Sequence, residues 1–236
     1  MPAGLQIRNN ANVLQIDGEC QHYVLLRKGT QTGTGIPNGL NYGDPNNPQT
    51  TQMDIPMNPG ELLAFTGPNP IAVAGSYQGR TQLHVFGPPA SSPVYYFVFG
   101  PYTPSGLNYG LLIRDANGNP IWDTGRPPMR VLSTAAGVGR FQGAAQGRNA
   151  ALICWQQYAR MELVNMVPHP GSIGLYDGLQ EVTSAFARVD GNDVVIQHQM
   201  YTGDPYGPYT LPNGTQGNAW DNGLNSKYTV VDVTGY

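Results

Sequence analysis

The sequence is poor in charged residues. Asp, Glu, Lys and Arg together make up 11% of its 236 residues, whereas about 25% is typical of a globular protein. Only Lys28 and Lys227 are lysines, and the formal net charge is −3. A weakly acidic chain without basic clusters has no electrostatic means of attracting nucleic acid. We therefore expect no nucleic-acid partner.

Cysteines and long apolar runs are also scarce. The two cysteines, Cys20 and Cys154, are too few for a disulfide framework. Cys154 lies in the apolar run AALICW, which predicts a buried thiol. No apolar run approaches the roughly 18 residues of a membrane-spanning helix, and no charged and then apolar leader opens the chain. The sequence thus predicts a soluble protein without a secretory signal or membrane insertion.

Glycine and proline, in contrast, are abundant, with 31 and 21 residues. Both are unfavourable inside helices, whereas turns between short strands need them. Together with 14 tyrosines and many Val, Ile and Thr residues, they predict an all-β protein with a β-sandwich or jelly-roll-like architecture. The only helix candidate is the stretch 180–188.

One phrase occurs twice in the chain. GLQIRNNANVLQID (4–17) and GLLIRDANGNPIWD (110–123) align without a gap. Each copy predicts a β-hairpin, and the Asn-Gly pair of the second accepts the positive φ angles of a tight turn. We interpret the phrase as architecture, in which the following residues hold backbone shape: Gly4, Ile7, Asp17, Gly110, Ile113, Asn117, Gly118 and Asp123.

The spacing of the two copies matches the size of a small sandwich domain. It favours two packed β-halves, residues 1–105 and 106–236, each opened by a similar hairpin. The alternative is one continuous β-sandwich. A further hairpin is predicted at VDGNDVV (189–195), with Gly191-Asn192 at the turn.

A calcium loop is suggested only in part. Asp115, Asn117 and Asn119 alternate as the first ligands of an EF-hand loop do. An EF-hand loop also needs a glycine and, further on, a glutamate at fixed positions. This chain has Pro120 and Arg126 there instead. We therefore predict a hairpin loop and no metal.

The residues that could form a catalytic site also lack the sequence spacing that would define one. Cys154 followed by His169 and His198 has the order of a cysteine peptidase without its local signature. Two of the carboxylates Asp177, Glu181 and Asp190 could form a glycosidase pair, but no spacing requires it. No glycine pattern of a nucleotide site is present. We predict no enzyme and no cofactor, and an envelope-degrading hydrolase is the least favoured reading.

The stretch 202–226 is predicted to be a loop rich in glycine and aromatic residues. Tyrosine and tryptophan offer rigid contact area, and Gly and Asn offer adaptable hydrogen bonding. We interpret the aromatic residues in and beside this stretch as a surface for a ligand, such as a sugar, or for a neighbouring subunit: Tyr201, Tyr206, Tyr209 and Trp220.

The repeated phrase, followed by the strand-like MRVL, resembles one found in structural tail proteins of long-tailed bacteriophages. The stretch VYYFVFG (94–100), read as a buried strand, precedes Tyr109-Gly110-Leu111 as it does in that group. The resemblance covers less than half of the chain.

This resemblance implies a non-enzymatic virion protein of a tail tip, baseplate or fibre complex, made in the host cytoplasm. Its expected partners are other tail subunits, in a symmetric homo-oligomer, and a host surface glycan or receptor during attachment. The alternative is a carbohydrate- or receptor-binding β-sandwich module.

Overall fold

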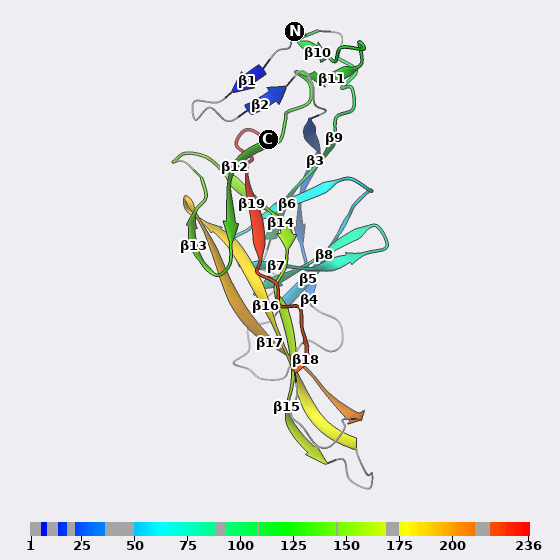
Figure 1. Ribbon diagram of the computed structural model, residues 1–236, viewed down its shortest axis with the longest axis vertical. Coiled ribbons are helices and arrows are strands. Elements are labelled where there is room, and N and C mark those ends of the chain that lie inside the picture. The colour runs from blue at the N-terminus through cyan, green and yellow to red at the C-terminus, as the bar shows by residue number, and fades with distance from the viewer. Residues whose placement is uncertain are drawn as a thin grey trace.

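The fold is seen in a computed structural model of the chain. It describes residues 6–8, 14–17, 22–35, 50–87, 93–107, 109–144, 146–168, 175–210 and 218–236. All regular elements in these ranges are β-strands, which confirms the predicted all-β class (Figure 1).

Two large antiparallel sheets form the body of the molecule. The six-stranded sheet has the order β12 (Arg130–Ala136), β19 (Lys227–Asp232), β14 (Ala150–Gln156), β6 (Leu62–Thr66), β9 (Pro93–Pro101) and β3 (Tyr23–Thr32). The nine-stranded sheet runs β13 (Gly139–Gln142), β17 (Asp193–Thr210), β16 (Leu175–Asp190), β7 (Ile71–Tyr77), β8 (Arg80–Phe86), β5 (Thr50–Pro56) and β4 (Thr34–Gly35). Its two remaining strands are β15 (Ala159–Pro168), which pairs with β16, and β18 (Asn218–Asp221), which pairs with β15.

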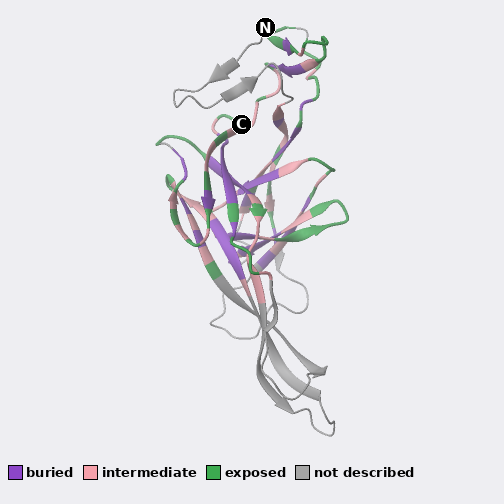
Figure 2. Ribbon diagram, viewed as in Figure 1, coloured by how far each residue is buried: buried purple, intermediate pink, exposed green. Residues whose placement is uncertain are grey.

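The main core lies between these two sheets. Its buried apolar side chains come from both layers and include Ile55, Phe65, Leu83, Leu152, Ile196 and Tyr228. Figure 2 shows the buried residues concentrated in this central part of the molecule. Along β5, buried residues alternate with more exposed ones, so this strand turns one face to the other sheet. The central strands of the six-stranded sheet are buried on both faces, as in β6, where Leu63 and Phe65 belong to the main core and Ala64 to a second apolar cluster. The body is therefore a β-sandwich.

Strands from both predicted halves enter both sheets. β14 of the second half pairs with β6 of the first, and β16 pairs with β7 through Ala187 and Ile71. The boundary between residues 1–105 and 106–236 is thus no boundary between sheets.

Two small hairpins lie outside the sandwich at one end of the long axis (Figure 1). One joins β1 (Gln6–Arg8) to β2 (Leu14–Asp17), and the other joins β10 (Leu112–Arg114) to β11 (Pro120–Asp123). We call the second hairpin, with the segments 102–107 and 109–111 that precede it, the hairpin end.

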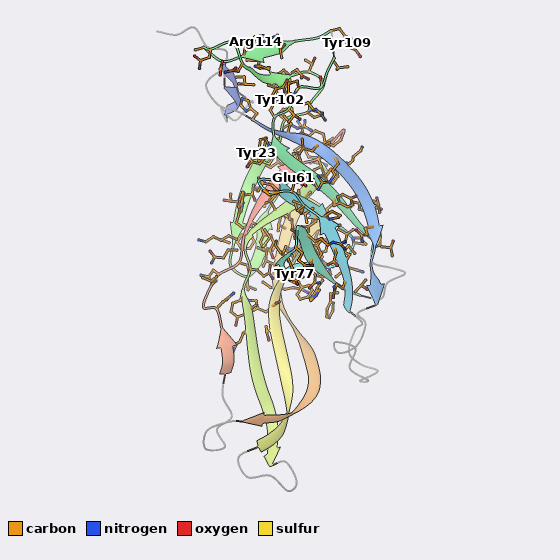
Figure 3. All side chains as sticks on the ribbon, turned by 90° about the vertical axis from the view of Figure 1, so that its right-hand side faces the viewer. Tyr23, Glu61, Tyr77, Tyr102, Tyr109 and Arg114 are labelled. Carbon is orange, nitrogen blue, oxygen red and sulfur yellow. The ribbon has the colours of Figure 1, made fainter. Side chains whose placement is uncertain are left out.

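At the opposite end, β15, β16, β17 and β18 continue beyond the sandwich as a narrow arm (Figures 1 and 3). β16 pairs with β17 from Asp190 and Asp193 at the turn to Leu175 and Thr210 at the far end. The predicted hairpin turn at Gly191-Asn192 is present, and Gly191 has a φ of 63°. We call the part of β15, β16, β17 and β18 that extends beyond the sandwich the arm.

Two expectations for this region are wrong. The helix candidate 180–188 is part of strand β16, because β15 and β17 both pair with it and satisfy its backbone groups. The stretch 202–226 is no continuous loop, since 202–210 belong to β17 and 218–221 form β18. Pro205 and Pro208 are compatible with β17 because, within the described residues, nothing pairs with that edge of the strand beyond Ile196.

Candidate functional site

The repeated phrase forms the same backbone structure twice. In the first copy Gln6 pairs with Asp17, Ile7 with Ile16 and Arg8 with Leu14. In the second copy Leu112 pairs with Asp123, Ile113 with Trp122 and Arg114 with Pro120. The register shifts after Ile7 and after Ile113, which are equivalent positions. Both copies are therefore hairpins with a bulge at the same place. Gly4 lies outside the described residues.

A small second core lies between the second hairpin and the sandwich. It consists of Val24 from β3, Tyr102, and Ile113, Ile121 and Trp122 from the hairpin. Backbone hydrogen bonds join the same parts, from Tyr102 N to His22 O at 2.9 Å and from Met129 N to Tyr23 O at 2.8 Å. Figure 3 shows Tyr102 between the hairpin and the sandwich.

Asp123, the last residue of the repeated phrase, is a buried carboxylate of the hairpin end. Its carboxylate accepts the Tyr102 hydroxyl at 2.6 Å and the backbone N–H groups of Ser105 at 2.9 Å and Gly125 at 2.7 Å. Burial by itself raises the pKa of Asp123, but these hydrogen bonds outweigh it and lower the pKa to about 2. Burial and the nearby Asp123 raise the pKa of Tyr102 to about 12. The carboxylate thus ties the segment 102–105 to the hairpin.

The loop of the second hairpin uses its polar residues for its own backbone. Asp115 accepts hydrogen bonds from the N–H groups of Asn117 and Asn119 at 2.9 and 2.8 Å, and from the Asn119 side-chain amide at 2.9 Å. Arg114 donates to the carbonyl of Gly118, which has a φ of 86°. These hydrogen bonds close the turn of the hairpin loop. Among the residues with described side chains, no group of three or more His, Cys, Asp or Glu is placed to hold a metal ion.

The aromatic residues expected to form a binding surface are spread along the arm. Tyr201, Tyr206 and Tyr209 are in β17, where they pair with Val182, Gly178 and Tyr176, and Trp220 in β18 pairs with Met161. The side chains of these residues lie outside the part of the chain that is described. Their use as a surface stays a prediction.

The residues of the hydrolase hypothesis lie in different surroundings. Cys154 is partly buried, its Sγ donates to Gln157 Oε1 at 3.4 Å, and burial raises the pKa of its thiol to about 11. His198 stacks on Tyr158 with ring centroids 4.3 Å apart. His169 and the side chains of Asp177 and Glu181 are outside the described residues.

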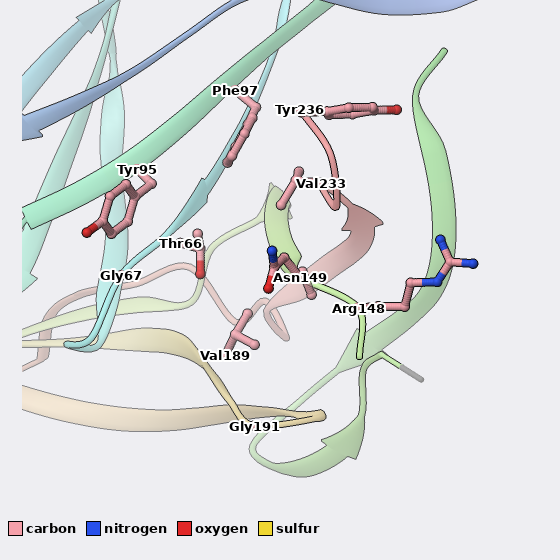
Figure 4. A pocket seen from close by; sticks show the side chains of 11 residues that line it. Thr66, Gly67, Tyr95, Phe97, Arg148, Asn149, Val189, Gly191, Val233 and Tyr236 are labelled. Atoms are coloured by element: carbon pink, nitrogen blue, oxygen red, sulfur yellow. The ribbon is translucent and has the colours of Figure 1, made fainter. Parts of the chain in front are cut away.

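A pocket that the sequence did not indicate opens on the outer face of the six-stranded sheet (Figure 4). Its volume is about 430 Å³, within the range of small-molecule sites. Tyr95 and Phe97 line one side, and they alternate along β9 with Val94 and Val98, which belong to the main core. The outer face of the stretch 94–100 is therefore only partly covered, since Tyr95 is 47% exposed whereas Phe99, on the same face, is fully buried.

The opposite side of the pocket is formed by the end of the chain. Val233 and Tyr236 fold back over the outer face, where the Tyr236 ring lies 6.0 Å from the ring of Phe99. The Tyr236 hydroxyl donates to the carbonyl of Pro128, and the Arg130 guanidinium lies 4.9 Å from the ring centroid. These contacts fix the position of the ring.

The polar rim comes from the loops that flank the central strands. Thr66 ends β6, while Arg148 and Asn149 directly precede β14. Arg148 forms an ion pair with Asp232 at 2.7 Å, and Asp232 is almost fully buried. In Figure 4 the Asn149 side chain points into the space between Thr66 and Val233. The pocket therefore combines aromatic rings with an amide and a guanidinium group.

The chain was also compared with known proteins. No helix that could cross a membrane occurs in the described part of the chain. Comparisons with protein-family models, curated proteins and solved structures found no match to this chain.

Proposed function

We propose that the protein is a non-enzymatic structural subunit of a multi-copy assembly, and that this assembly is the tail tip, baseplate or fibre complex of a bacteriophage. The family part of the proposal depends on the resemblance of the repeated phrase. The structural part depends on the two ends of the molecule, because both extend beyond the sandwich (Figure 1).

The arm is the observation that carries the proposal. Its far part is a ladder of β15, β16 and β17, with Pro168 paired to Tyr176 and Tyr176 paired to Tyr209, whereas β18 pairs with β15 nearer the sandwich. In the two perpendicular views of Figures 1 and 3, no other described strand covers it. A sheet is stable when one of its faces is buried against a second layer. A neighbouring subunit would supply that layer.

The hairpin end supports the same conclusion from the other side of the molecule. Leu107, Tyr109, Leu111 and Leu112 all belong to its exposed large apolar residues. Figure 3 shows Tyr109 at the outer limit of this end. Apolar groups gathered on an exposed surface mark contact sites for other proteins. An elongated subunit with a contact site at each end can join neighbours in a symmetric assembly.

Electron microscopy of the parent particles, with this chain labelled, tests the proposal. We expect the label at a fixed, symmetric position on the tail. Absence of the chain from purified particles would refute the proposal.

A photo-crosslinking amino acid then tests the two contact sites. Placed at Tyr209 in the arm or at Leu111 in the hairpin end, it should join the chain to another tail subunit within the particle. The matched control is Tyr77, an exposed residue at the end of β7, beside the turn to β8. Crosslinks at Tyr77 alone would contradict the assignment of both ends as contact sites.

A further inference from the structure

We propose that the pocket on the outer face of the six-stranded sheet binds an uncharged saccharide. One sugar ring would stack on Tyr95 and Phe97, and its hydroxyl groups would bond to Asn149 and Arg148. This inference goes beyond the assembly role and does not depend on it, because the pocket is built from one chain (Figure 4). It also lies away from the arm, since Val189 and Gly191, which line it, are at the turn end of the β16–β17 pair.

The aromatic side chains match the apolar face of a sugar ring. Tyr95 and Phe97 are two positions apart on β9 and so lie on the same face, about 7 Å apart along the strand. Nearly half of the Tyr95 surface is exposed, although burying such a ring would be favourable. The C–H groups of one pyranose ring could cover this surface.

Asn149 supplies hydrogen bonding at the right place. Its backbone is fixed, because its N–H donates to Thr234 Oγ1 at 2.7 Å and its carbonyl accepts the N–H of Val233 at 2.9 Å. Its side-chain amide forms no hydrogen bond with the described part of the chain. An amide has both donors and acceptors, so it can bind two neighbouring hydroxyl groups.

The charges of the pocket favour an uncharged ligand. Arg148 is the cation of the rim, and it pairs at 2.7 Å with the buried Asp232, a carboxylate that it shares with Arg130 at 3.5 Å. A phosphate or carboxylate ligand would have to compete with that ion pair. The guanidinium group has five N–H donors, and it is about half exposed. Its remaining donors can still bind neutral hydroxyl groups.

A purely apolar ligand fits less well. It would cover the Asn149 amide and the Thr66 hydroxyl, and covering polar groups without hydrogen bonds is costly. The Tyr236 ring is already held by Arg130, Phe99 and the carbonyl of Pro128. A wall fixed before binding lowers the entropic cost of binding.

A glycan array probed with the complete, labelled chain is the first experiment, and we expect binding to a defined group of neutral glycans. Isothermal titration with a bound glycan then measures the affinities of variants. Tyr95→Ala and Asn149→Ala should each weaken binding about tenfold or more, whereas Tyr95→Phe should retain most of it. Tyr77→Ala is the matched control, since this tyrosine is 73% exposed but does not line the pocket.

Three results would overturn the inference. They are binding to none of the arrayed glycans, unchanged affinity of Tyr95→Ala, and equal losses in Tyr95→Ala and Tyr77→Ala. If Tyr95→Ala instead reduces self-association in sedimentation velocity and no glycan binds, the pocket is a protein contact. These measurements use the free chain, so their outcome is separate from whether the chain is found in tail particles.

Discussion

The sandwich and the hairpin end bury different kinds of groups. In the sandwich, Phe65 and Leu83 belong to one large apolar cluster between two sheets. At the hairpin end, the apolar cluster is small, and a carboxylate, Asp123, lies beside it with three hydrogen-bond donors around it. Asp123 is only 8% exposed, and Leu83 is fully buried.

The difference follows from the size of each part. A two-stranded hairpin is at best marginally stable alone and cannot bury much apolar surface. A network of hydrogen bonds to a buried charge gives it a single position instead. The sandwich has two broad sheets and can depend on apolar burial. The predictions below test this contrast, from the largest expected effect to the smallest.

Leu83→Ala should cause the largest loss of stability. Removing a fully buried leucine leaves a cavity in the core, and such changes cost about 2–5 kcal/mol of unfolding free energy. Urea unfolding followed by circular dichroism measures the loss. Leu111→Ala is the matched control at the hairpin end, where the side chain is about half exposed, and it should change stability by less than about 0.5 kcal/mol. Equal losses would contradict the contrast.

Asp123→Asn should weaken the hairpin end and leave the sandwich folded. An asparagine keeps only one of the two oxygens, so its NH2 group would replace the acceptor either of Tyr102 and Ser105 or of Gly125. The expected cost is about 1–3 kcal/mol for hydrogen bonds to a charged group. Hydrogen exchange should become faster at the Ser105 and Gly125 amides. Asp115→Asn, in the exposed loop, is the control, and unchanged exchange in Asp123→Asn would refute the role of the carboxylate.

Lowering the pH should reveal how much the Asp123 carboxylate contributes to stability. The folded-state pKa of Asp123 is about 2, below the ordinary value of 3.8. Its contribution to stability is therefore complete above about pH 4 and is lost as the pH falls towards 2. The contribution of Glu61 in the sandwich should be lost over the same pH range. Glu61 accepts hydrogen bonds from Arg27 at 2.7 and 2.8 Å, and these lower its pKa to about 2.

Variants separate the two carboxylates. In Asp123→Asn, exchange at the hairpin end should no longer accelerate between pH 4 and 2, whereas in Glu61→Gln the acid dependence of overall unfolding should decrease. Hydrogen exchange measured across this pH range reports on the hairpin end, and the midpoint of urea unfolding reports on the whole molecule. The same pH dependence in wild type and Asp123→Asn at the hairpin end would argue against a buried anion there.

Gly118→Ala should have the smallest effect. Gly118 has a φ of 86° at the hairpin turn, where an alanine is strained by about 1 kcal/mol. Gly75 in β7 has no such φ and has open space where a Cβ would be, so Gly75→Ala should be close to neutral. Thermal unfolding and amide exchange in the hairpin compare the two. Equal effects would show that turn strain is not decisive at Gly118.

The sequence predicted the local features of the fold well. The hairpins at 4–17 and 110–123 and the turn at Gly191-Asn192 depend on residues close together in the chain. The stretch 180–188 was mispredicted because pairing with β15 and β17 overrides its local preference. The strand at 202–210 was missed for a similar reason, since its glycines and prolines predict a loop.

The pocket was not predictable in the same way. Tyr95, Asn149 and Tyr236 come from distant parts of the chain and meet only when β9, β6, β14 and β19 lie side by side. The one signal in the sequence was the alternation in VYYFVFG, which places Tyr95 and Phe97 on the face opposite to Val94 and Val98.

By itself, the sequence determined the strand class, the turns and the doubled hairpin, because these follow from backbone preferences within a few residues. Tertiary structure alone decided which strands became neighbours and which face of β9 was covered. It also decided that Asp123 would be surrounded by donors from the segment 102–105 and Gly125. Most of these pairings, although not that of Asp123 with Gly125, join residues far apart in the chain, and their free energy depends on the packing of the whole molecule.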